Sequence, residues 1–132
     1  MHNVQLCHLH LLAAWVGFLC GALSGGVAGL FFHGEDWLGG YGSYPRRLIR
    51  LGHISFFGLG FLNAFFALTI STTRIPELLG RLASLGLLAG AVTMPLCCFA
   101  AAWHKPLRCL FPIPVTSLIG GVSLVVLILV IS

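Results

Sequence analysis

Charged side chains are scarce in this sequence of 132 residues. Lysine, arginine, aspartate and glutamate together make up 8% of it, whereas a typical soluble domain carries about 25%. The seven basic and three acidic residues fall within three short stretches, 35–50, 74–81 and 105–108, and the segments around them are apolar. A soluble domain of this length could not bury so much apolar surface, so the composition favours a membrane protein.

The apolar segments contain no carboxylate, because Glu35, Asp36 and Glu77 all lie in the charged stretches. A proton-coupled exporter of this size would normally need a buried acidic residue. The sequence also has no phosphate-binding loop and no set of serine, histidine and aspartate, which favours a protein without catalytic activity of its own. The basic residues adjoin apolar segments, so they indicate membrane topology rather than a partnership with nucleic acid.

Four apolar segments are each long enough to cross a hydrocarbon core of about 30 Å as a helix that rises 1.5 Å per residue. They run over about 9–32, 48–72, 82–103 and 110–131. None shows the alternation of a membrane strand, and lipid demands that backbone groups be satisfied internally. The sequence therefore predicts an all-α fold, a single transmembrane domain over 1–132 that forms an integral membrane four-helix bundle with short loops.

The basic residues predict the orientation of this bundle. Because short links make consecutive helices antiparallel, one side collects five of the seven basic residues and the other side collects two. The five are Arg46, Arg47, Arg50, Lys105 and Arg108, and the two are Arg74 and Arg81. The positive-inside rule then predicts that both termini lie outside, in what we expect to be a bacterial inner (plasma) membrane.

A row of glycines at every fourth position marks the first segment, formed by Gly17, Gly21, Gly25 and Gly29. Small residues at this spacing let a second helix approach backbone to backbone. The row predicts either a tight contact with a partner subunit or a second copy, or packing against the other helices of the same chain.

Histidines stand at the ends of the small-residue faces of three segments, and we expect those faces to point inward. His10 begins the glycine row, His53 precedes Gly60 by seven residues, and His104 lies eighteen residues after Gly86. An imidazole can ligate haem iron through one nitrogen while the other is hydrogen-bonded. His53 and His104 are therefore candidate axial ligands of haem b. Alternatively, they are interfacial residues that bond carbonyls or lipid headgroups, or residues that handle protons or a quinone.

Two further pairs carry weaker signals. Cys7 and His10 are three residues apart and share a helical face, which would suit a soft or borderline metal, although an interfacial cluster gives the same pattern. Asn63 and Thr93 lie near the middle of the second and third segments. They are candidates for an interhelical hydrogen bond or for contacts along a transport path.

Taken together, these features predict a small non-catalytic subunit or assembly partner of a larger membrane complex. The inward histidines favour a respiratory or electron-transfer complex as the host. One alternative is a small electron carrier that binds haem b through His53 and His104. Another is a homo-oligomeric channel or carrier with Asn63 and Thr93 along its path.

Overall fold

The chain folds into four long helices, with no strand among the residues that the structure describes. The computed structural model describes residues 2–132, and the side chains from Val4 onward. The helices are α1 (His2–Phe32), α2 (Tyr44–Thr72), α3 (Glu77–Trp103) and α4 (Pro112–Ile131). Two short 3-10 helices, η1 (Trp37–Gly39) and η2 (Lys105–Leu110), lie in the connections after α1 and α3. The predicted all-α fold is confirmed, and all four helices are long and apolar enough to cross a membrane.

The helices extend beyond the apolar segments at several ends. The apolar segments predict starts at about 48 and 82, but α2 begins at Tyr44 and α3 at Glu77. Ser43 caps α2 by accepting a hydrogen bond from the Arg46 amide at 3.3 Å, and Pro45 occupies the first turn, where a missing amide proton costs nothing. Hydropathy alone leaves out these polar first turns.

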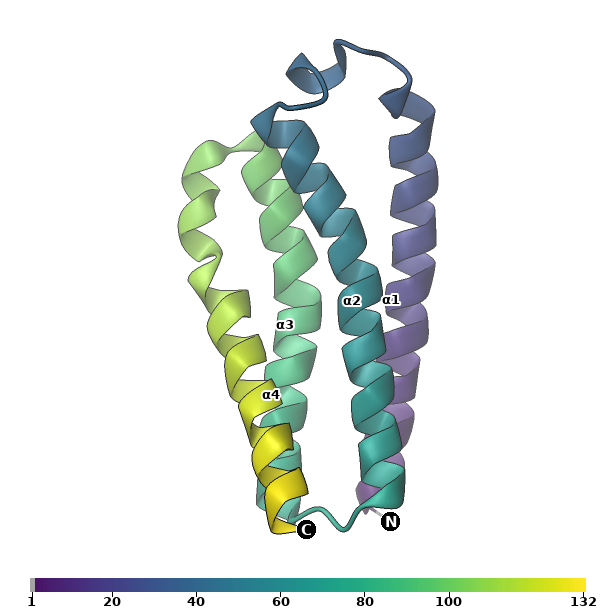
Figure 1. Cartoon of the computed structure of the whole chain (residues 1–132), viewed down its shortest axis with the longest axis vertical. Coiled ribbons are helices and arrows are strands. Elements are labelled where there is room, and N and C mark those ends of the chain that lie inside the picture. The colour runs from purple at the N-terminus through teal and green to yellow at the C-terminus, as the bar shows by residue number, and fades with distance from the viewer. Residues whose placement is uncertain (1) are drawn as a thin grey trace.

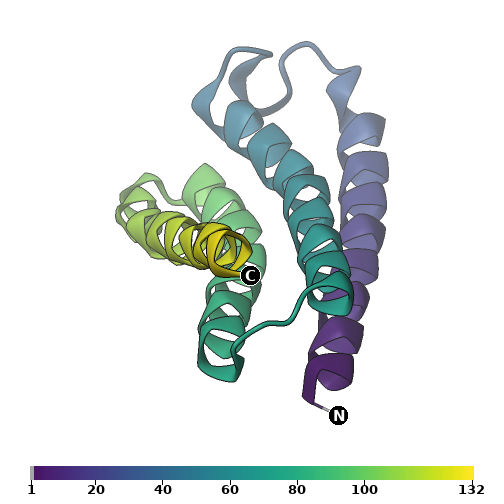
Figure 2. The same cartoon turned by 60° about the horizontal axis from the view of Figure 1, so that its bottom comes forward.

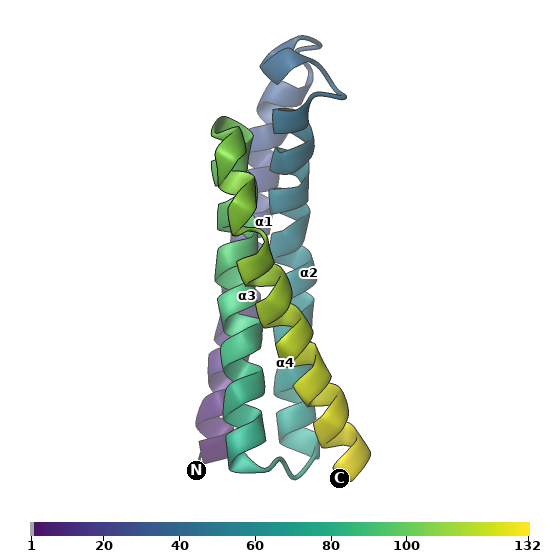
Figure 3. The same ribbon diagram turned by 90° about the vertical axis from the view of Figure 1, so that its left-hand side faces the viewer.

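Consecutive helices run antiparallel and form two hairpins, α1 with α2 and α3 with α4 (Figure 1). The hairpins meet mainly through α2 and α3, while α1 approaches α3 at only a few positions and lies far from α4 (Figures 2 and 3). Both termini lie at the same end as the α2–α3 link (Figure 1). We call this the termini end, and we call the opposite end, with the connections 33–43 and 104–111, the basic end.

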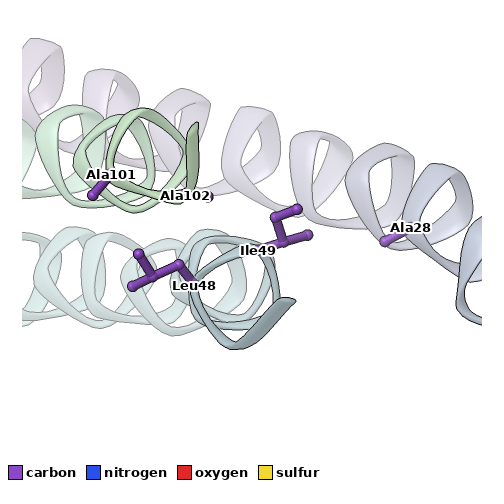
Figure 4. Packing of buried hydrophobic residues seen from close by; sticks show 5 residues of the cluster. All are labelled: Ala28, Leu48, Ile49, Ala101 and Ala102. Carbon is purple, nitrogen blue, oxygen red and sulfur yellow. The ribbon is translucent and has the colours of Figure 1, made fainter. Parts of the chain in front are cut away.

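The buried apolar residues form two small clusters instead of one continuous core. One lies toward the basic end, where α1, α2 and α3 contribute five side chains (Figure 4). These are Ala28, Leu48, Ile49, Ala101 and Ala102. The other lies toward the termini end and consists of Phe66, Ile70, Ala83, Leu87 and Ile128. Many large apolar side chains on all four helices are instead exposed, which suits a surface in contact with lipid.

Three of the four glycines in the α1 row contact α2 of the same chain. A Cβ added to Gly17 would lie 3.1 Å from the Phe56 carbonyl oxygen, and one added to Gly21 would lie 2.6 Å from the Phe57 ring. A Cβ on Gly25 would overlap the His53 ring, whereas Gly29 has no neighbouring atom within 4 Å of that position. The row therefore packs the first hairpin together, and only Gly29 remains uncovered.

The buried guanidinium of Arg46 closes the end of α1. Its Nη2 donates to the Phe32 carbonyl at 2.6 Å, and its Nη1 donates to the carbonyls of Gly34 and Glu35 at 3.3 and 3.2 Å. These are carbonyls at and just beyond the helix end, where no intrahelical donor is available. The guanidinium also lies 4.8 Å from the centre of the Phe32 ring, a cation–π distance. Arg46 thus ties the start of α2 to the end of α1.

Candidate functional site

The best-defined polar site lies at His10, where three helices meet. The His10 side chain of α1 is completely buried. Its Nδ1 lies 2.6 Å from Asn63 Oδ1 on α2, and its Nε2 lies 2.8 Å from Ser84 Oγ on α3. The Asn63 amide nitrogen donates to the Leu59 carbonyl at 2.8 Å. We call His10, Asn63 and Ser84 the histidine network.

The hydrogen bonds of the network fix the tautomer of a neutral His10. Because the Asn63 amide nitrogen donates to Leu59, its Oδ1 faces the ring and accepts. Nδ1 must then carry the proton, and Nε2 accepts a hydrogen bond from the Ser84 hydroxyl. Both ring nitrogens are satisfied, and the Phe66 ring meets the imidazole edge to face at 4.6 Å. The network thereby links three helices through one side chain.

The two mid-helix polar residues behave differently. Asn63 bonds His10 of another helix, whereas the Thr93 hydroxyl donates to the Ala89 carbonyl of its own helix at 2.6 Å. Ser84 is not among the residues that the sequence predicted for a site. The signal for it is a lone hydroxyl within an apolar segment, but seven other serine and threonine hydroxyls in the long helices give the same signal and bond only their own helix.

The structure gives the predicted metal pair no further ligand. Cys7 Sγ lies 3.5 Å from the Ala67 carbonyl oxygen, and both ring nitrogens of His10 are hydrogen-bonded to the network. Among the described residues, no group of three or more histidine, cysteine, aspartate or glutamate side chains gathers in one place. A metal site at Cys7 and His10 stays a prediction that would require His10 to give up a network partner.

The predicted haem ligands lie in unlike surroundings. His53 is half-buried between α1 and α2, its Nδ1 is 3.2 Å from Ser24 Oγ, and its ring meets Phe57 edge to face at 5.5 Å. His104 is exposed, so the expectation that it points inward is wrong. The reason is that α3 ends at Trp103, and the extended backbone of His104 takes its side chain out of the helical phase. Haem ligation by the two residues stays a prediction.

An apolar groove runs between α1 and α3, with α2 as its floor. Its two parts have volumes of about 430 and 560 Å³, and they adjoin at Cys20 and Phe56, which line both. The smaller part begins next to the histidine network, near Leu9 of α1. The larger part ends between Trp37 and Trp103 at the basic end. The His10–Ser84 hydrogen bond therefore joins α1 and α3 at one end of the groove, and the two helices flank an open apolar space beyond it.

No protein-family model, curated protein or solved structure matches this chain at a significant level. Three features of the molecule itself therefore bear on its function. These are the histidine network, the groove, and the small residues of α1 that no other helix covers.

Proposed function

We propose that this chain is an integral membrane protein, a four-helix bundle of the bacterial inner membrane with both termini outside. We further propose that it is a small non-catalytic subunit or assembly partner of a larger membrane complex. The length and apolar character of all four helices support the membrane assignment. The five basic residues that cluster at one end support the orientation, because such residues are retained on the cytoplasmic side.

The observation that carries the proposed role is a second small-residue face on α1. Ala22, Gly26 and Gly29 are exposed, and a Cβ added to either glycine would meet no atom within 4 Å. Glycine inside a helix costs roughly 0.5–1 kcal/mol relative to alanine, and contact with lipid does not offset that cost. Close approach of another helix does offset it. We call these three residues the open face and propose that a helix of the partner protein packs on it.

The histidines support an electron-transfer or respiratory complex as the host. His10 is buried and His53 is half-buried at helix contacts of the first hairpin. Ionisable side chains inside membrane helices are expensive and usually functional. In this proposal the subunit places such groups beside the redox centres of the host.

A test of this role begins with mass spectrometry of what co-purifies with the tagged protein in mild detergent. Stoichiometric larger membrane proteins are expected. Gly26→Leu should then reduce their recovery. Gly58→Leu should not, because Gly58 is equally open but lies on α2 among the large exposed side chains of Ile54, Phe61 and Leu62, not on a small-residue face. Purification without a stoichiometric partner, or equal recovery with both variants, would contradict the proposal.

His53 supports a second candidate function, a small haem-b electron carrier. Its Nδ1 is held by Ser24, which leaves Nε2 to ligate iron in the arrangement usual for axial histidines. In this alternative His104 supplies the other ligand. A visible spectrum of the purified protein tests it, because a reduced haem-b band is expected only if the protein binds haem.

A further inference from the structure

The groove between α1 and α3 has the apolar lining and the volume of a site for a lipid chain. The 560 Å³ part lies toward the basic end and is lined by apolar side chains that include Leu23 and Val27 of α1 and Phe99 of α3. Trp37 and Trp103 stand at its end, and tryptophan is enriched where hydrocarbon meets the headgroup layer. A chain that enters between the two tryptophans would therefore run inward from the membrane surface.

The charge at this end of the molecule favours an anionic headgroup. Five of the seven basic residues lie at this end, whereas the acidic residues there are only two, Glu35 and Asp36. Lys105 follows Trp103 by two residues, is exposed, and has its Nζ 5.9 Å from the centre of the Tyr44 ring. Arg46 lies 5.8 Å from the Trp37 ring and is 3% exposed, so it contributes through its charge rather than by direct contact.

We propose that the larger part of the groove binds one acyl chain of an anionic phospholipid. The headgroup of this lipid lies beside Trp103 and Lys105 at the basic end. The lipid fills the apolar space that lies between α1 and α3 beyond the His10–Ser84 hydrogen bond.

The size of the groove suits a lipid chain. Its larger part holds about 560 Å³ between apolar side chains of α1, α2 and α3, which is enough for one narrow, flexible chain. The groove is also a different surface from the open face, because its α1 lining includes Cys20, Leu23 and Val27 and none of the residues of that face. The two proposals can therefore fail separately.

The test is native mass spectrometry of the full chain released from nanodiscs. The nanodiscs contain equal amounts of phosphatidylglycerol and phosphatidylcholine with identical acyl chains. We expect one retained lipid per protein, with phosphatidylglycerol preferred. Lys105→Gln should lower that preference about fivefold, the factor expected for one cation beside an anionic lipid. Arg74→Gln, at the opposite end, is the matched control and should leave the preference unchanged.

A second pair of variants tests the groove itself. Val27→Trp would fill the cavity and should abolish lipid retention, whereas Leu30→Trp should not, because Leu30 is 71% exposed and does not line the groove. Size-exclusion chromatography and helical circular dichroism confirm that both variants are folded. Equal retention of the two lipids, equal retention by the two tryptophan variants, or a protein that crosslinks to the groove in place of lipid would overturn the proposal.

Discussion

Replacing Asn63 with leucine should destabilise the protein through His10 rather than through the lost side chain itself. The substitution keeps the branched shape and the number of heavy atoms but removes the acceptor that lies 2.6 Å from His10 Nδ1. Because His10 is completely buried, its N–H would be left without a partner or water, which costs about 1–3 kcal/mol. The Leu59 carbonyl loses only the side-chain donor and keeps its backbone hydrogen bond within α2. The expected loss therefore exceeds the roughly 0.6 kcal/mol of an average interhelical hydrogen bond in a membrane.

Reversible unfolding in mixed micelles of mild detergent and dodecyl sulfate measures this loss. The matched control is Thr93→Val, which removes a hydroxyl that bonds only its own helix and should change the free energy of unfolding by less than about 0.5 kcal/mol. Adding His10→Leu to Asn63→Leu removes the unpaired donor, so the double variant should be more stable than Asn63→Leu alone. Two results would refute this role of Asn63. One is a loss from Asn63→Leu no larger than that from Thr93→Val. The other is a double variant whose loss equals the sum of the losses from His10→Leu and Asn63→Leu alone.

Three further outcomes follow from the packing and from the histidines. Gly21→Leu should lower the free energy of unfolding by about 1–3 kcal/mol, because its Cβ would meet the Phe57 ring. Thermal denaturation in detergent measures this loss, and an unchanged midpoint would contradict it. Arg46→Met should expose the end of α1, since the Phe32 carbonyl loses the donor that lies 2.6 Å away. We expect faster amide hydrogen exchange over residues 33–37. Wild-type protection there would show that the cap is dispensable. If the protein binds haem b, His53→Ala should abolish the reduced band, and an unchanged haem content would exclude this ligand.

The number and type of the helices could be predicted because they depend on local quantities. An apolar run of sufficient length has only one way to satisfy its backbone in lipid, so the four segments predict the four helices. The glycine row also predicted close helix packing, but not which helix would fill it. In the structure α2 covers Gly17, Gly21 and Gly25, and it leaves Gly29 open. That choice depends on the crossing of two whole helices rather than on the spacing within one.

The polar residues show where prediction from the sequence ends. Helical phase placed His10 on an inner face, yet the sequence offered Cys7 as its neighbour and Thr93 as the counterpart of Asn63. The partners in the structure are Asn63 and Ser84, which lie 53 and 74 residues away. His104 was misplaced for another reason, because one residue beyond a helix end the helical phase no longer applies.

The sequence by itself determined that this chain forms four apolar helices with most of its positive charge at one end. Length, hydropathy and the alternation of antiparallel helices are properties of the chain read in order. Only the tertiary structure decided that a buried histidine joins three helices, and that α1 and α3 leave an apolar groove beyond that junction. Those features arise from the register and divergence of helices packed against one another, which depend on side-chain contacts between residues far apart in the sequence.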